Sequence, residues 1–214
     1  MTMKYGLSQM VATAVAGVAL LTAAPFVYAQ DAYEQLRTKL AAIDTLQAQF
    51  EQQVFDDRGE LQEQLSGELT LKRPHFLRWE TEFPDESVMV ADGRAVWYYN
   101  AFVEQLSIFD QAQDLEQNPM LVLLSDDESA WQSFEVSVDD GMWYIRENQA
   151  SYAQTSLGIR FSDSNAIQTL KIDDGQGQVS VFELSQIRMN EPVNDALFEV
   201  EVPAHVDIDD QRSR

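Results

Sequence analysis

The side chains that most often perform catalysis are scarce in this chain. It has no cysteine and only two histidines, His75 beside a proline and His205 near the C-terminus. No G-x-S-x-G, H-E-x-x-H, P-loop or G-x-G-x-x-G motif is present. Two histidines still permit a serine–histidine–acid triad, but both positions are typical of surface or turn residues. We therefore expect a protein that is not an enzyme, with no zinc site and no cofactor.

Acidic side chains are abundant instead. The chain has 36 Asp and Glu against 14 Lys and Arg, a formal net charge of −22. Adjacent acidic pairs are too frequent to indicate general acid–base catalysis, and the Asp-Asp-Gly runs at 139–141 and 173–175 lack the spacing of an EF-hand. A charge of this sign repels nucleic acid and anionic membranes. It indicates adaptation to a salty habitat, a protein kept away from lipid surfaces, or both.

Three basic side chains form an unusual cluster in this acidic chain. Lys72, Arg73 and Arg78 lie close together, among proline and large apolar residues. One interpretation is a cluster at a strand end that pairs with nearby acids. The other is that one arginine holds a movable cover, because a guanidinium has five donors and can bind several helix-end carbonyls at once. Such a contact would act as a latch.

Hydrophobic spacing indicates which elements position this cluster. Tyr33, Leu36, Leu40 and Ile43 recur at intervals of three and four, which predicts an amphipathic helix. Apolar and polar residues then alternate from 46 to 109 and from 134 to 202, which predicts about eleven strands in one antiparallel meander that ends with a strand at 197–202. A sheet of this size must curl, so the expected class is mainly β with a concave face.

Residues 110–131 interrupt the alternating pattern. Asn118-Pro119 can start a helix, and the apolar residues 120–124 follow without alternation. We expect short helices here which, with the N-terminal helix, cap the concave face. No linker or repeat divides the chain, so residues 30–214 are expected to form a single domain.

The N-terminus has the features of a secretory signal peptide. Lys4 supplies a basic start, Val11–Ala24 an apolar run, and Val27-Tyr28-Ala29 a small-x-small cleavage site. The run is short for a membrane span, and no cysteine follows it for lipid attachment. Residues 1–29 are therefore predicted to be a signal peptide that is removed on export.

Short motifs in a fixed order resemble the LolA family of periplasmic lipoprotein carriers. Lys72-Arg73-Pro74 followed by Arg78-Trp79 is similar to the family's K-R-P-x-x-F-x-W segment. Further similar segments follow the same order along the chain: Phe50-Glu51-Gln52, Pro84-Asp85-Glu86-Ser87, Asp92-Gly93, Trp97-Tyr98-Tyr99-Asn100, Phe102-Val103-Glu104-Gln105, Asn118-Pro119 and Asp209-Asp210-Gln211-Arg212. Each motif alone is weak, but together they cover residues 31–212.

The resemblance implies an unclosed antiparallel β-barrel with a helical lid, at about 110–131, over an apolar cavity. It implies a monomeric carrier that accepts lipoproteins from an inner-membrane ABC transporter, shields their acyl chains and delivers them to the outer-membrane acceptor LolB. Arg73 matches the family's lid latch. The lid residues are expected to be Pro119, Met120, Leu121, Leu123 and Leu124.

Five apolar residues are candidates for the acyl-chain cavity or a partner surface: Leu77, Trp79, Met89, Trp97 and Tyr99. Ordinary core packing is the alternative for each of them. Leu77 stands where the family usually has phenylalanine, and Phe76 has moved to the preceding position, on the opposite side of the strand. The alternative function is a periplasmic lipid- or lipoprotein-sensing module of the same fold, and a lipid-modifying enzyme ranks third.

Overall fold

The computed structural model describes residues 25–112, 123–124, 128–148, 155–202 and 204–212. Its helices are α1 (Pro25–Ala41), the short α4 (Glu128–Trp131) and a 3₁₀ helix, η1 (Asp195–Phe198). The strands are β1 (Thr45–Phe55), β2 (Leu61–Lys72), β3 (Phe76–Phe83), β4 (Ser87–Asp92), β5 (Ala95–Asn100), β6 (Gln105–Asp110), β7 (Phe134–Asp139), β8 (Met142–Glu147), β9 (Ser156–Phe161), β10 (Ile167–Asp173), β11 (Val179–Met189) and β12 (Asp207–Asp210).

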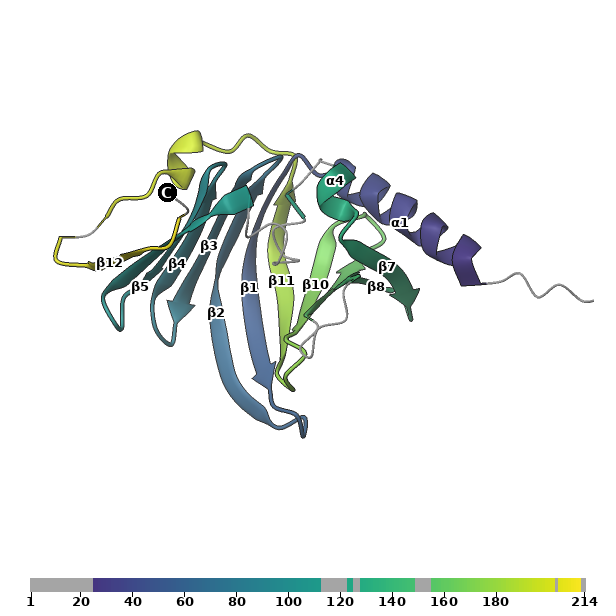
Figure 1. Ribbon diagram of the computed structural model, residues 1–214, viewed down its shortest axis with the longest axis horizontal. Helices are drawn as coiled ribbons and strands as arrows, with labels where there is room; N and C mark the ends of the chain where they lie inside the picture. The colour runs from purple at the N-terminus through teal and green to yellow at the C-terminus, as the bar shows by residue number, and fades with distance from the viewer. Residues whose placement is uncertain (1–24, 113–122, 125–127, 149–154, 203, 213–214) are drawn as a thin grey trace, which may run out of the picture.

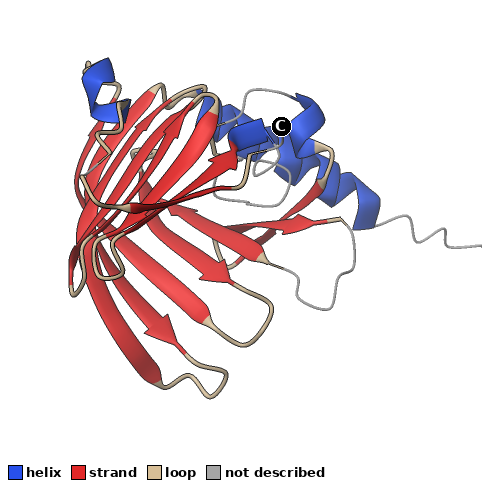
Figure 2. Ribbon diagram, turned by 60° about the vertical axis from the view of Figure 1, so that its left-hand side comes forward, coloured by secondary structure: helices blue, strands red, loops and turns tan. Residues whose placement is uncertain are grey.

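All twelve strands belong to one curled, unclosed sheet (Figures 1 and 2). Their order is β12-β6-β5-β4-β3-β2-β1-β11-β10-β9-β8-β7, so β12 and β7 form the two edges. The predicted mainly β class with an unclosed sheet is confirmed. The simple meander is wrong, because β1 pairs with β11 in the middle of the sheet and β12 runs parallel to β6. Alternation alone does not identify such distant partners.

The predicted last strand is also corrected. Residues 195–198 form η1, the next four residues are not in a strand, and the final strand is β12 at 207–210. Asn194 caps η1, its side-chain oxygen accepting a hydrogen bond from the Ala196 N–H at 3.1 Å. The apolar residues Leu197 and Val202 thus belong to a segment that crosses the sheet and not to one of its strands.

The concave face carries one continuous apolar cluster. Leu36 and Leu40 of α1 and Trp131 of α4 pack in the same cluster as strand residues on both sides of β1. Trp79 lies at its centre, with its ring centroid 4.9 Å from that of Phe50 and 5.0 Å from that of Phe182. Figures 1 and 2 show α1 and α4 beside the open side of the curled sheet. Burial of these rings and leucines ties the helices to the sheet.

Gly67 of β2 allows the sheet to curl tightly around this cluster. A Cβ atom added there would lie 1.9 Å from the Glu80 carbonyl oxygen of β3 and 2.9 Å from the Phe50 ring. Any side chain would therefore force β2 and β3 apart. Glycine lets the two backbones approach while Phe50 fills the space beneath them.

The opposite, outer face carries a smaller apolar cluster. Val96 joins the concave cluster, whereas its neighbours Ala95 and Trp97 belong to the outer one, as expected when successive side chains of a strand point to opposite faces. Ala95 is buried there with Leu106 and Ile108. The segment that contains η1 and β12 covers part of this face (Figure 1).

Candidate functional site

Arg73 lies between the sheet and the two helices. It follows the last residue of β2, and its backbone N–H donates a hydrogen bond to the Asp44 carbonyl at 2.9 Å. Its side chain is half-buried and lines a hollow of about 270 Å³. The other lining residues come from α1 and α4: Glu34, Arg37, Thr38, Leu40, Ala41 and Trp131. The predicted latch residue therefore stands beside both helices.

The C-terminal end of α1 closes one side of this hollow. Asn190 fixes that end, because its side-chain amide donates to the Ala42 carbonyl at 2.9 Å and accepts from the Asp44 N–H at 2.8 Å. The Asn165 amide donates to the Lys39 carbonyl at 3.2 Å. A helix C-terminus carries partial negative charge, so a guanidinium beside it is favourably placed. Arg73 thus lies beside the end of α1, and its action as a latch stays a prediction.

The predicted lid lies only partly within the described residues. Leu123 and Leu124 are buried in the concave cluster, as is Trp131 of α4. Pro119, Met120 and Leu121 lie outside the described residues. Leu123, Leu124 and Trp131 therefore pack on the concave side, and the action of this region as a lid stays a prediction.

The five candidate cavity residues divide between the two faces. Leu77 and Trp79 are buried in the concave cluster, and Met89 packs against it. Trp97 and Tyr99 pack against the outer cluster instead. Trp97 and Tyr99 are therefore not placed to line a concave cavity with the other three, and the roles of all five in cargo or partner binding stay predictions. Both faces of β5 are apolar, so alternation could not decide which of Trp97, Tyr98 and Tyr99 points inward.

The basic cluster separates into two roles. Lys72 forms an ion pair with Asp195 at the start of η1. Arg78 binds the Glu80 carboxylate on the outer face with hydrogen bonds of 2.9 and 2.7 Å. Two members thus pair with nearby acids, as the simpler interpretation expected, and only Arg73 lies beside the helices.

Phe76 and Leu77 lie on opposite faces, as the strand period predicts. Leu77 is buried in the concave cluster. Phe76 packs on the outer side against the buried Phe198 of η1, with ring centroids 5.2 Å apart. The displaced aromatic residue therefore supports the C-terminal segment and does not replace Leu77 in the concave cluster.

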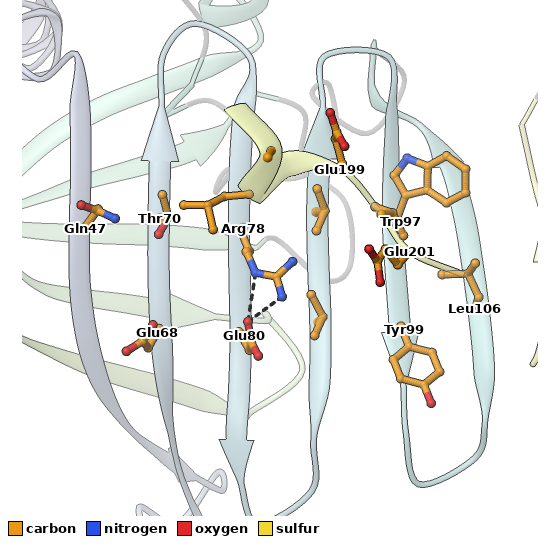
Figure 3. A pocket seen from close by; sticks show the side chains of 15 residues that line it. Gln47, Glu68, Thr70, Arg78, Glu80, Trp97, Tyr99, Leu106, Glu199 and Glu201 are labelled. Atoms are coloured by element: carbon orange, nitrogen blue, oxygen red, sulfur yellow. Dashed lines mark hydrogen bonds and ion pairs between the residues drawn. The ribbon is translucent and has the colours of Figure 1, made fainter. Parts of the chain in front are cut away.

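The outer face also contains a hollow that sequence reasoning missed. It has a volume of about 600 Å³ and lies between strands β1–β6 and the C-terminal segment (Figure 3). Glu68, Glu80, Glu199 and Glu201 line it together with Arg78. Residues far apart in the sequence build this hollow, so no local motif could have revealed it.

A polar network surrounds Trp97 beside the end of the C-terminal segment. The Trp97 indole N–H donates to the Asp92 carboxylate at 2.8 Å, and the Arg212 guanidinium lies 5.6 Å from the centre of the Trp97 ring. Burial alone would raise the pKa of Asp92, but hydrogen bonds from the Ala95 N–H, the Trp97 indole and the Arg94 N–H outweigh it and lower that pKa. Hydrogen bonds from Arg212 to Asp210 raise the pKa of Arg212. The Asp92 carboxylate and the Arg212 guanidinium therefore stay ionised at neutral pH.

The described ranges of the chain bring together no group of three His, Cys, Asp or Glu side chains suited to a metal ion. Over the same residues, no helix has both the length and the apolar character needed to cross a membrane.

Comparison with known proteins places this geometry in a family. Residues 41–201 match the family model described as outer membrane lipoprotein carrier protein LolA. An outer-membrane lipoprotein carrier protein from Idiomarina loihiensis is 40% identical to this chain, and the match covers 83% of this chain and 87% of the relative. An outer-membrane lipoprotein carrier protein from Shewanella loihica is 36% identical, and the match covers 90% of this chain and 94% of the relative. The fold is shared by a solved structure of a DUF1329 family protein from Desulfovibrio piger, with a TM-score of 0.50. The two chains are 8% identical, and the match covers 80% of this chain and 97% of the other. The chain belongs to the LolA family of outer-membrane lipoprotein carrier proteins.

Proposed function

We propose that this protein carries lipoproteins across the periplasm by shielding their acyl chains against the concave face. The apolar cluster under α1 and α4, with Arg73 beside both helices, is the observation that supports this proposal most strongly. The concave face is the larger apolar surface, and side chains of the covering helices pack on it. Movement of those helices would expose apolar surface to a ligand.

The energetics favour loose burial over a tight fit. Each buried CH₂ group contributes about 0.8 kcal/mol, so complete burial of several acyl chains would contribute on the order of 30 kcal/mol. Affinity of that size would prevent release. A carrier must instead cover the chains enough to prevent aggregation and still release them to an acceptor. Cargo can bind only after the helices that pack on the apolar surface have moved away from it. The free energy needed to move them weakens cargo binding and so permits release.

Arg73 is proposed to set this balance as the latch. In the empty protein its guanidinium holds the helices against the rim of the sheet, and each hydrogen bond from such a charged donor contributes roughly 1.5–3 kcal/mol. Cargo entry breaks these contacts. The broken contacts raise the free energy of the loaded state and so promote release.

The same proposal includes the path of the carrier and its cargo through the cell envelope. Residues 1–29 direct export and are removed, which leaves a monomeric protein in the periplasm. An inner-membrane ABC transporter loads the carrier, and LolB accepts the cargo at the outer membrane. The transporter supplies free energy from ATP hydrolysis, which allows cargo to enter a carrier that binds it only loosely.

A release assay tests the proposal. Spheroplasts that contain labelled lipoprotein in the inner membrane are incubated with the purified protein and then sedimented. A carrier moves labelled lipoprotein into the supernatant as a complex with itself. A sensing module of the same fold leaves the lipoprotein in the pellet, and that outcome would overturn the proposal.

A further inference from the structure

The tips of two neighbouring hairpins present large apolar side chains to solvent. Phe102 is 77% exposed, Phe83 is 61% exposed and Val103 is 56% exposed. Phe83 ends β3 before the turn into β4, and Phe102 and Val103 form the turn from β5 to β6. Because β4 pairs with both β3 and β5, the two turns lie at the same end of the sheet. Exposed phenylalanines gathered in this way are typical of interaction sites.

Hydrogen bonds hold the two tips in place. The Ala101 N–H donates to the Glu86 carbonyl at 3.0 Å and so joins one turn to the other. The Asn100 side-chain oxygen accepts from the Phe102 N–H at 3.0 Å and from the Val103 N–H at 3.4 Å. The exposed rings are therefore presented on a fixed backbone, which lowers the entropy lost when a partner binds.

Carboxylates surround the exposed rings. Glu82, Asp85, Glu86 and Glu104 are all exposed in these two tips. The nearest basic residues in sequence are Arg78, bound to Glu80, and Arg94, at the opposite end of β4 and β5. A hollow of about 320 Å³ adjoins the tips and is lined by Glu80, Thr81, Glu82, Glu86, Val88 and Tyr99. Glu80 and Tyr99 lie near this end of their strands in Figure 3. The hollow thus offers carboxylates beside an aromatic ring, an environment suited to a lysine or arginine side chain.

We propose that this hairpin-tip surface, formed by Phe83, Phe102, Val103 and the acidic hollow, docks a membrane protein whose periplasmic contact surface carries Lys or Arg beside an apolar recess. The acidic rim matches a basic protein surface and disfavours an anionic bilayer or a second copy of this acidic chain. The inference rests on the proposed carrier function, which requires the protein to meet membrane-bound partners.

The position of this surface suits a carrier. β3 runs from Phe76, near Arg73, to Phe83 at the tips. Eight residues of extended strand span about 25 Å. A partner bound at the tips therefore leaves Arg73 and the α1 end free to move. Docking and opening use opposite ends of the same strands.

Binding to membranes tests this inference. The purified protein is mixed with washed membrane vesicles, inner and outer, that expose their periplasmic faces, and with liposomes made from the lipids extracted from them. We expect binding to at least one type of vesicle and not to the liposomes. Phe83→Ser with Phe102→Ser should lower the bound fraction about tenfold, and Glu82→Gln with Glu86→Gln should lower it about threefold. Val138→Ser and Glu135→Gln, matched changes of exposed residues on β7, should bind as wild type.

Several outcomes would overturn the inference. Equal binding to liposomes and vesicles would show that the hairpin-tip surface binds lipid. If the wild-type protein sediments as a dimer and the Phe83/Phe102 variant as a monomer, the surface binds a second copy of this chain. Unchanged binding by that variant, or no wild-type binding to either vesicle type, would show that the surface docks no membrane protein. Failure of the carrier function is separate: it is seen when wild-type protein binds the vesicles but releases no lipoprotein from them.

Discussion

The two faces of the sheet are both apolar, but they are covered in different ways. On the concave side, one continuous cluster joins α1, α4 and strands from both halves of the sheet. On the outer side, a small cluster lies beside a C-terminal segment that is held by the β12–β6 pairing, the Lys72–Asp195 ion pair and the Phe76–Phe198 contact, and acidic side chains line the adjoining hollow. The difference teaches that, within the described residues, the concave face combines a large apolar surface with packed helices. That combination suits the proposed reversible binding of acyl chains, whereas the outer cover is joined to the sheet by strand pairing, a ring contact and an ion pair.

Removal of a central concave side chain should have the largest effect on stability. Phe50→Ala deletes a ring that contacts Trp79 and Phe182, so we expect the free energy of unfolding to fall by about 3–5 kcal/mol. Urea denaturation followed by tryptophan fluorescence measures this change. A loss below 1 kcal/mol would mean that the concave cluster does not hold the two halves of the sheet together.

Removal of an aromatic ring on the outer side should lower the free energy of unfolding by a smaller amount. Phe198→Ala removes the ring of η1 that packs on Phe76, but the short C-terminal segment can detach locally, so we expect a loss of about 1–2 kcal/mol. Hydrogen exchange localises the effect. The Asp207 and Gln211 amides, which bond to the β6 side of the sheet, should exchange faster, while β1–β11 amides keep their wild-type rates. Uniform acceleration through the sheet would contradict the local character of this cover.

Acid should weaken the β4–β5 turn through Asp92, whose carboxylate accepts hydrogen bonds from Arg94, Ala95 and Trp97. The pKa of Asp92 is lowered in the folded protein, so its carboxylate contributes stability above its unfolded-state value of 3.8, and the contribution disappears as the pH falls through the folded-state value. Asp92→Asn should therefore reduce stability by about 1 kcal/mol at pH 7 and by nothing at a pH below the folded-state pKa. Urea melts of both proteins across this range provide the measurement. A difference that stays constant with pH would show that the Asp92 charge does not stabilise the folded protein.

The sequence predicted the positions of individual helices and strands better than the pairing between strands. Alternation located β1, and the interval of three and four located Leu36 and Leu40, because burial on one face imposes those periods. The β1–β11 pairing, the parallel β12 and the outer hollow depend on residues far apart in sequence. Local spacing therefore could not reveal them.

The candidate site was predicted only in part, because local spacing does not show which face of the sheet a residue occupies when both faces are apolar. Arg73 could be singled out by residue type and by resemblance, and the structure places it beside the helices. Trp97 and Tyr99 were candidates for a cavity or a partner surface, because alternation could not orient β5 when both of its faces are apolar; the structure packs them on the outer cluster. Where one face is polar, alternation reveals orientation; where both are apolar, it does not.

One measurement tests the central claim most directly: the transfer of lipoprotein from the loaded protein to LolB, compared between Arg73→Leu and Arg78→Leu. Both variants remove a guanidinium from β2–β3, but only Arg73 lies beside the helices, while Arg78 binds Glu80 on the outer face. We predict that Arg73→Leu still accepts cargo and that its transfer rate falls at least about tenfold, since the loss of even one latch hydrogen bond, roughly 1.5 kcal/mol, stabilises the loaded state relative to the empty one. Arg78→Leu should transfer at the wild-type rate. Transfer by Arg73→Leu at the wild-type rate would contradict the proposal that this guanidinium opposes cargo binding.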